Sequence, residues 1–330
     1  MKTFNVAVIG VGHLGKEHAR IYNALTDVRL VAVVDNDVQR GQNIARQYHT
    51  SFYRSAKALL KQPLNLDAVN IVTPTKTHYA ISREFIKRGI HTFIEKPITV
   101  KPSEAKTLVK LARRKRVVLQ VGHIQRFNPA LQAVWSEIKQ PRFIEAHRLS
   151  SFTARSFDID VILDLMIHDL DLVLALTRSP LKQVDANGVQ VLSNMVDIAN
   201  ARLVFRNGCV ANLTASRISD KSMRRLRAFT SRAYFSVDFL IPEATIYQRR
   251  TPPKDFKTFL TKTPLSKETL HMLMTQQFYQ VKKPEITREE PLHLELASFI
   301  ECAMKRRNPL VTGEDGLKAL ELAHQILKKI

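Results

Sequence analysis

Two short segments carry the side chains best suited to acid–base chemistry. Lys96 lies between Glu95 and Pro97, directly after an apolar run that predicts a buried strand. A partly desolvated lysine beside a bound cation loses preference for its ammonium form, so its amine can accept a proton from a substrate. Asp164 and His168 lie four residues apart in a strongly helical stretch, so they share one helix face. A lysine that precedes a proline is, on its own, more often a surface residue than a catalytic one. An Asp/His pair on a helix is likewise more often structural.

A glycine-rich turn near the start of the chain predicts a dinucleotide site. Residues 10–15 read Gly-Val-Gly-His-Leu-Gly, and they follow an apolar run and open a helical pattern. In such a turn one glycine makes the bend, a second lets backbone N–H groups approach a pyrophosphate, and a third permits close helix–strand packing. Asp35 ends the next strand, about 20 residues further on. Its carboxylate suits ribose hydroxyls and repels a 2′-phosphate, which favours NAD over NADP.

Further cofactor contacts are expected where other predicted strands end. Thr73 and Pro74 follow the apolar run 68–72, and His78 stands just inside the next helical pattern. Ligands of open parallel sheets bind at the carboxyl ends of the strands. The expected cofactor-binding residues are Gly10, Gly12, His13, Leu14, Gly15, Asp35, Thr73, Pro74, His78, Glu95 and Lys96.

The elements that must position these residues alternate regularly over the first 122 residues. Amphipathic helical patterns separate short apolar runs, which lie at 6–9, 30–34, 68–72, 92–94 and 117–121. Continuous apolar strands indicate a sheet that is buried on both faces. We therefore predict an α/β protein whose residues 1–122 form an N-terminal Rossmann domain with a doubly wound parallel sheet.

The pattern changes from residue 123 onward. One strong helix is predicted at 160–176, and strand-like runs lie at 143–149, 184–191, 199–205, 209–215 and 233–239. Runs of strands outside βαβ units predict a mostly antiparallel sheet, so residues 123–330 are expected to form an α+β domain. Residues 241–291, rich in Pro, Thr and Lys, receive no assigned structure. Helices at 293–305 and 316–329 close the chain.

Composition excludes several classes of protein. The 330 residues are 45% hydrophobic and 25% charged, with two cysteines and no Cys/His spacing typical of metal ligands, so no metal is expected. No apolar run approaches the roughly 20 residues needed to span a bilayer. We expect a cytoplasmic protein. The formal charge of +21 is spread along the chain and lacks any nucleic-acid-binding signature, so we expect a small anionic partner instead of nucleic acid.

These motifs, taken together and in this order, resemble the Gfo/Idh/MocA family, named for glucose–fructose oxidoreductase and inositol dehydrogenase. The resemblance extends to the closing segment 309–316, Pro-Leu-Val-Thr-Gly-Glu-Asp-Gly, and covers nearly the whole chain. It implies NAD(P)-dependent oxidation of secondary hydroxyls of sugars and cyclitols. It also implies an open-faced C-terminal sheet, a homodimer or homotetramer formed through that sheet, and catalytic roles for Lys96, Asp164 and His168, with Asp164 orienting His168.

The substrate has to be inferred from the remaining side chains. Segments 122–129 and 156–160 resemble the family members that oxidise the 3-hydroxyl of UDP-N-acetylglucosamine, whose keto product is later aminated for lipid A. Arginine forks suit diphosphate oxygens. The expected substrate-binding residues are Gln125, Arg126 and Arg155. Other second-domain arginines are candidates, although a surface role is commoner for any one of them: Arg148, Arg217, Arg224, Arg225 and Arg227.

Two alternative functions remain at this point. One is a dehydrogenase that acts on a free sugar or inositol. The other is a dinucleotide-sensing regulatory protein without turnover, which the presence of Lys96 and His168 argues against.

Overall fold

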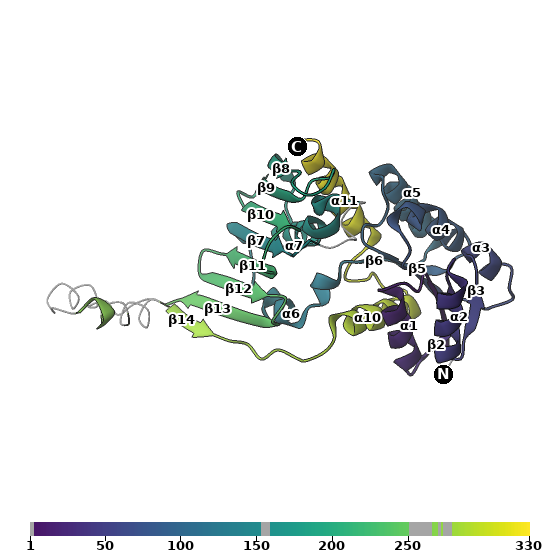
Figure 1. Ribbon diagram of the computed structural model, residues 1–330. Helices are drawn as coiled ribbons and strands as arrows, with labels where there is room; N and C mark the ends of the chain where they lie inside the picture. The colour runs from purple at the N-terminus through teal and green to yellow at the C-terminus, as the bar shows by residue number, and fades with distance from the viewer. Residues whose placement is uncertain (1–2, 153–158, 251–265, 270–271, 273–278) are drawn as a thin grey trace. The chain divides into compact units, whose positions relative to one another are not determined.

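The computed structural model describes residues 3–152, 159–250, 266–269, 272 and 279–330, and the chain forms two compact units (Figure 1). Unit 1 comprises Met1–Phe127, Ile162–Leu174 and Glu289–Lys328. Unit 2 comprises Asn128–Val161, Ala175–Arg288 and Lys329–Ile330. The single domain boundary between residues 122 and 123 stays a prediction, because unit 1 adds two later segments to its N-terminal part.

Unit 1 contains a six-stranded sheet in the order β3-β2-β1-β4-β5-β6. All of its strand pairs are parallel, so the predicted doubly wound Rossmann sheet is confirmed. The strands are β1 (Phe4–Ile9), β2 (Val28–Val34), β3 (Ser51–Tyr53), β4 (Ala68–Ile71), β5 (His91–Glu95) and β6 (Leu119–Gly122). The three-residue edge strand β3 was not predicted, because so short a segment has no apolar run.

The helices and helical turns of unit 1 come from all three of its segments. They are α1 (Gly15–Ala24), α2 (Val38–Gln47), α3 (Ala56–Leu59), α4 (Thr75–Lys87), α5 (Pro102–Lys115), the 3-10 turn η1 (Ile124–Phe127), the π-helical turn η3 (Ile162–Met166), α7 (Ile167–Thr177), α10 (Pro291–Lys305) and α11 (Gly313–Leu327). The late helix α10 belongs to the same core cluster as the first strand, through Leu296 and Phe299 beside Val8 and Phe93. The rings of Phe93 and Phe299 meet edge to face, with centroids 5.7 Å apart.

Unit 2 contains an eight-stranded sheet in the order β14-β13-β12-β11-β7-β10-β9-β8. Only β7 and β10 run parallel among these pairs, so the predicted mostly antiparallel sheet is confirmed. Its elements are α6 (Pro129–Trp135), β7 (Phe143–Leu149), β8 (Leu181–Val189), β9 (Ile198–Phe205), β10 (Val210–Ser216), β11 (Met223–Phe229), β12 (Ala233–Asp238), β13 (Glu243–Arg249) and β14 (Tyr279–Lys282). Strands β13 and β14 lie within the stretch 241–291 that the sequence left unassigned.

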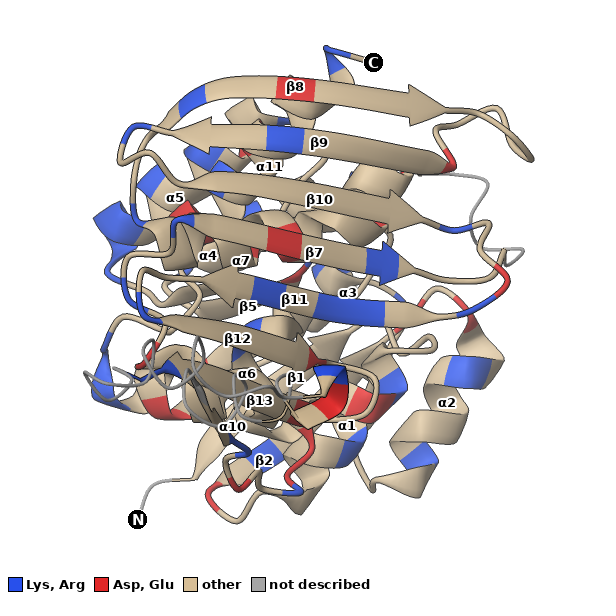
Figure 2. Cartoon of the chain, turned by 90° about the vertical axis from the view of Figure 1, so that its left-hand side faces the viewer, with Lys and Arg blue, Asp and Glu red and all other residues tan. Residues whose placement is uncertain are grey.

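Strand β11 was not predicted, because arginines interrupt its apolar residues. In the sheet, Leu226 and Ala228 are buried, whereas Arg225 and Arg227 are exposed on the opposite face. Figure 2 shows the strands of this sheet, with Lys and Arg coloured blue along β9 and β11. Arg225 pairs with Asp238 at 2.8 Å and Arg227 with Glu145 at 3.3 Å.

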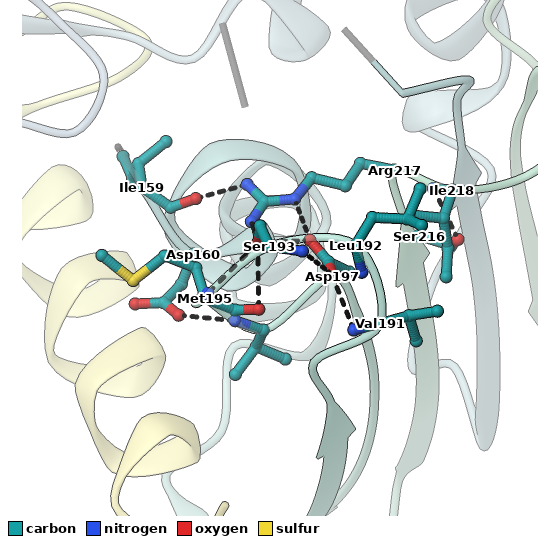
Figure 3. Close-up of polar contacts among 11 residues, drawn as sticks. Ile159, Asp160, Val191, Leu192, Ser193, Met195, Asp197, Ser216, Arg217 and Ile218 are labelled. Carbon is teal, nitrogen blue, oxygen red and sulfur yellow. Dashed lines mark hydrogen bonds and ion pairs between the residues drawn. The ribbon is translucent and has the colours of Figure 1, made fainter. Parts of the chain in front are cut away.

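A fully buried ion pair lies at one end of this sheet (Figure 3). Arg217 Nε donates to Asp197 Oδ1 at 2.9 Å, and its other nitrogens bind Ser193 Oγ and the carbonyl of Ile159. Asp197 Oδ2 accepts three successive backbone N–H groups, from residues 191–193, at 2.7 to 2.9 Å. These contacts fill the fork of Arg217, so the structure gives it a structural role and not the substrate contact considered for it.

Candidate active site

The glycine-rich turn between β1 and α1 has the geometry that a dinucleotide pyrophosphate needs. Gly10 adopts a φ of +90°, and a Cβ there would lie 2.5 Å from the Val72 carbonyl oxygen. A Cβ on Gly15 would lie 1.9 Å from the Gly10 carbonyl oxygen, so this glycine permits the close start of α1. The space beside Gly12 is open to at least 4 Å, which leaves room for a phosphate. The predicted glycine roles therefore fit a bound dinucleotide.

His13 and Leu14 lie exposed at the start of α1, and 49% of Leu14 is accessible. The Leu14 side chain forms no helix cap, and the N–H groups of Lys16, Glu17 and His18 bind the backbone carbonyls of Gly12 and Leu14. Helix N-termini of this kind bind anions. Both residues are therefore placed where a cofactor could contact them, as predicted from the motif.

Asp35 ends β2 beside this turn and is almost fully buried. Its carboxylate accepts hydrogen bonds from the backbone N–H groups of Val11 and Asp37, each at 2.9 Å. The Arg40 guanidinium binds both carboxylate oxygens, at 2.9 and 3.2 Å. Burial raises the pKa of Asp35, but the hydrogen bonds from Arg40 and the backbone outweigh burial and lower it. Arg40, which sequence reasoning missed, already fills part of the acceptor capacity that ribose hydroxyls would use.

His78 connects the ends of two neighbouring strands and has both ring nitrogens occupied. Nε2 lies 2.7 Å from the Thr73 carbonyl oxygen and Nδ1 lies 2.9 Å from the Pro97 carbonyl oxygen. Burial lowers its pKa, although the two carbonyls act in the opposite direction, and a neutral ring donates to one carbonyl at a time. The ring holds the segment with Thr73 and Pro74 against the segment after Lys96, and cofactor binding by His78 stays a prediction. Thr73 and Pro74 remain half-buried and exposed, respectively.

Lys96 and Asp164 meet at the carboxyl end of β5. Lys96 Nζ donates to the Asp164 carbonyl oxygen at 2.7 Å and lies 3.1 Å from Asp164 Oδ1. Asp164 belongs to the π-helical turn η3, a feature often found at functional sites. In this structure the Asp164 carboxylate holds Lys96, and its predicted role of orienting His168 stays a prediction. The Lys96 side chain is 17% exposed, so it is only partly buried.

The helix that carries Asp164 continues with two further anchored side chains. His168, half-buried, lies edge to face with the His123 ring, with centroids 6.3 Å apart. Arg126 Nε and Nη2 donate to the two Asp171 carboxylate oxygens, at 2.6 and 2.9 Å, in a buried bidentate ion pair. Asp164, His168 and Asp171 thus contact Lys96 after β5, His123 after β6 and Arg126 in η1, respectively.

The substrate residues predicted from segment 122–129 are buried in unit 1. Arg126 is 6% exposed and its ion pair with Asp171 fixes α7 on η1, while its predicted contact with a diphosphate stays a prediction. Gln125 is 8% exposed, and its buried Oε1 has no hydrogen-bond partner among the described residues. Arg155 and the segment 156–158 lie outside the described residues. Arg148 in unit 2 is 2% exposed.

A buried polar strip, formed by Tyr22, Asn70, His18 and Glu95, lies behind Lys96. The Tyr22 hydroxyl donates to Asn70 Oδ1 at 2.7 Å, and Asn70 Nδ2 lies 3.0 Å from His18 Nδ1. Since Asn70 donates to Nδ1, the His18 proton resides on Nε2, which lies 3.3 Å from Glu95 Oε1. Burial raises the pKa of Glu95, but the hydrogen bond from His18 and the charge of Lys96 outweigh burial and lower it. Glu95 is therefore an anion held inside the fold.

Gly122 makes room for this anion. It pairs with Glu95 across β5 and β6, and a Cβ on Gly122 would lie 2.8 Å from Glu95 Oε2. The motif suggested Glu95 as a cofactor contact, whereas the structure turns its carboxylate toward His18 and Gly122. No sequence signal pointed to this packing.

The assembled residues can carry out proton transfer beside a dinucleotide. The turn at Gly10, the end of β4 and Lys96 lie at the same edge of one parallel sheet, because their strands are neighbours in the order β1-β4-β5. Within the described part of the chain, no cluster of His, Cys, Asp or Glu could hold a metal ion. None of the described helices is long and apolar enough to span a membrane.

Comparison with known proteins identifies two matching family models. One, described as "Oxidoreductase family, NAD-binding Rossmann fold", matches residues 4–123. The other, described as "GFO/IDH/MocA C-terminal domain", matches residues 130–236.

Individual relatives agree with these models. A UDP-N-acetylglucosamine 3-dehydrogenase of Acidithiobacillus ferrooxidans is 44% identical over 243 residues, which is 73% of this chain and 76% of its own. A solved structure of this enzyme from the same organism matches with a TM-score of 0.87 and 35% identity, covering 100% of this chain and 98% of that chain. An inositol 2-dehydrogenase of Rhizobium meliloti is 25% identical over 340 residues, covering 99% of this chain and 97% of its own.

Proposed function

Because this chain belongs to the Gfo/Idh/MocA family of NAD-binding oxidoreductases, we propose that it oxidises the 3-hydroxyl of UDP-N-acetylglucosamine to the 3-keto sugar nucleotide. One geometric observation carries the reaction type: Lys96 Nζ is held by Asp164 at 2.7 and 3.1 Å, at the carboxyl end of β5. The choice of substrate is supported by the 44% identical relative, which is named for this reaction.

In this proposal the chain's own residues hold the reactants and move one proton. NAD, when bound, accepts the hydride from the carbon that is oxidised. Lys96 Nζ takes the proton of the substrate hydroxyl, Asp164 fixes the position of Nζ, and His168 orients the hydroxyl. A positioned general base of this kind contributes about 10²- to 10⁴-fold to the rate.

The cofactor is held by the turn and strand ends described above. Gly10, Gly12 and Gly15 allow the pyrophosphate to approach the start of α1, with His13 and Leu14 beside it. Asp35 receives the ribose hydroxyls, while Thr73 and Pro74 border the site at the end of β4.

The proposal also covers the oligomeric state of the enzyme and the cellular compartment in which it acts. The open face of the unit 2 sheet, shown in Figure 2, supports pairing with a second copy as a homodimer or homotetramer. On that sheet, Tyr234 stacks between Phe229 and Tyr247, at centroid distances of 4.6 and 5.0 Å. Both cysteines are free, which is consistent with a cytoplasmic enzyme whose product is aminated for lipid A.

A substrate panel tests the proposed reaction. UDP-N-acetylglucosamine, UDP-glucose, free N-acetylglucosamine and myo-inositol are compared at matched concentrations, with NADH formation as the readout. UDP-N-acetylglucosamine should give the highest kcat/KM, and loss of the nucleotide should lower kcat as well as raise KM, because remote binding energy positions the reacting carbon. If myo-inositol or the free sugar is oxidised faster than both UDP-sugars, the substrate is wrong and the inositol dehydrogenase alternative replaces it.

A further inference from the structure

Glu295 is a fully buried carboxyl group that the proposed reaction does not use. It lies on α10 and is 0% exposed. Neither carboxyl oxygen has a hydrogen-bond partner among the described residues. A buried polar group without a partner is rare and calls for a physical explanation.

The surroundings of Glu295 disfavour a second negative charge. Burial, the Glu95 carboxylate and the Asp171 carboxylate all raise the pKa of Glu295 well above its usual value. Asp171 is already paired with Arg126, and the Glu95 carboxylate lies 3.3 Å from His18 Nε2. An ionised Glu295 would have no cation of its own among these contacts, and burial of an unpaired charge is strongly unfavourable.

A protonated Glu295 would instead satisfy a second orphan atom. Gln120 on β6 donates through Nε2 to the Glu295 carbonyl oxygen at 3.3 Å, so the two residues are neighbours. Gln120 Oε1 is buried and has no donor among the described residues. The O–H of a neutral carboxyl group is such a donor, acting directly or through one enclosed water molecule.

We propose that Glu295 keeps a proton at neutral pH, donates it as a hydrogen bond toward Gln120, and so leaves Glu95 to carry the negative charge of the buried polar strip. Glu295 is then a positioning residue: it acts on Lys96 through the preceding residue Glu95. Its loss of the proton at alkaline pH would place two like charges beside each other behind the site. This role for Lys96 rests on the proposed function, whereas the protonation of Glu295 does not.

Four other titratable side chains face the region around Glu295. Tyr22 and His18 approach from α1, and burial raises the pKa of Tyr22 well above its usual value. His123, after β6, is neutral because burial lowers its pKa. Asp171 faces the region from α7. Among these groups, Glu295 is the carboxyl that is kept from ionising both by its burial and by the neighbouring negative charges.

Unfolding of E295Q as a function of pH tests the protonation. For a carboxyl whose folded pKa is raised, the wild type loses stability as pH rises from the usual value of about 4.3 to the folded pKa. The folding equilibrium constant of the wild type should therefore fall by up to about tenfold per pH unit relative to E295Q. E301Q, the same change on the exposed side of α10, should show no such divergence. A protein difference infrared spectrum should show a protonated carboxyl band that E295Q removes.

The expected kinetic result separates positioning from packing. E295Q should keep its kcat at alkaline pH, where the wild-type kcat falls. E295M is a second uncharged variant. As pH rises, its stability relative to the wild type should increase in the same way as that of E295Q. The inference is overturned if both variants track the wild-type pH dependence of unfolding, or if the infrared band survives in E295Q. Failure of the substrate panel alone would leave it standing.

Discussion

Lys96 and Asp164 are 68 positions apart in the sequence, yet two hydrogen bonds join the lysine amine to the aspartate, one to its backbone and one to its side chain. The backbone bond depends on η3 being in place, and the side-chain bond depends on the carboxylate. The position of the proton-accepting amine is therefore set by a helix that follows the Rossmann strands by a long stretch of chain.

Replacing Lys96 by Met should abolish turnover while leaving NAD binding nearly intact. The loss of kcat should be about 10²- to 10⁴-fold, since a single acid–base group is removed. Asp164→Asn keeps the backbone bond and should give a smaller loss, with the pH dependence of kcat changed. Steady-state kinetics and calorimetric NAD titration measure the two effects. Near-normal kcat in the Lys96→Met variant would eliminate this residue as the base.

Arg126→Ala should destabilise the fold and not act selectively on nucleotide substrates. It would leave the buried Asp171 carboxylate unpaired, at a cost of about 3–5 kcal/mol in the free energy of unfolding. The double variant Arg126→Leu with Asp171→Leu removes both charges and should recover much of that loss. Urea unfolding checks the stabilities. Full stability of Arg126→Ala, with weaker binding of UDP-sugars only, would restore a substrate role for Arg126.

Cofactor selectivity should depend on Arg40 as well as on Asp35. Arg40→Ala frees acceptor sites on the Asp35 carboxylate and removes a cation beside it, so NAD affinity should rise by up to about tenfold, or ~1.4 kcal/mol. The preference over NADP should increase in parallel. Asp35→Ala should narrow or reverse the preference. Dissociation constants for both dinucleotides test this, and tighter binding of NADP than NAD by the wild type would contradict it.

Gly122→Ala should disturb Glu95, because its Cβ would lie 2.8 to 2.9 Å from the carboxylate oxygens. His18 holds that carboxylate in place, so the strain should cost about 1–3 kcal/mol in stability and lower kcat. Glu95→Asp shortens the side chain, and the double variant should recover part of the stability lost in Gly122→Ala. Additive losses in the double variant would show that the two residues do not interact in this way.

Acid should weaken unit 2 through Asp197. Burial raises the pKa of this carboxyl, but hydrogen bonds from Ser193 and from three backbone N–H groups outweigh burial and lower it strongly. The stability it contributes is present above the usual carboxyl pKa of about 3.9 and is lost as pH falls toward the folded pKa. Asp197→Asn should cost about 3–5 kcal/mol near neutral pH, because Arg217 loses its partner charge. The difference from the wild type should shrink in acid; a constant difference would contradict this.

The sequence predicted the Rossmann sheet well because its signals are local. The turn at 10–15 has fixed glycine requirements, and five buried strands read as apolar runs. Lys96 and the Asp164/His168 pair were found for the same reason: each lies in a short motif. Strand β11 was missed because one of its faces is exposed and carries arginines. These alternate with the buried Leu226 and Ala228, so the strand has no continuous apolar run.

The missing parts of the site depend on tertiary contacts. Nothing in the sequence around Arg126 shows that Asp171 will engage it, so it read as a free arginine. Glu295 sits in a helical pattern where a glutamate is ordinarily solvent-facing. Arg40 lies on a surface helix, and only the folded structure shows that it binds the Asp35 carboxylate. Such pairings require the three-dimensional arrangement.

The assembly of unit 1 from three segments has a consequence for synthesis. Residues 1–127 leave the ribosome first, but the helix α10 that joins their core, through residues such as Leu296 and Phe299, follows much later. At 5–20 residues per second, the wait from residue 127 to residue 328 is roughly 10–40 s. During that time the core residues that pack with α10, such as Val8 and Phe93, lack part of their packing. The nascent chain is therefore a client for chaperones until its last helices emerge, and truncation before α10 should yield an aggregating product.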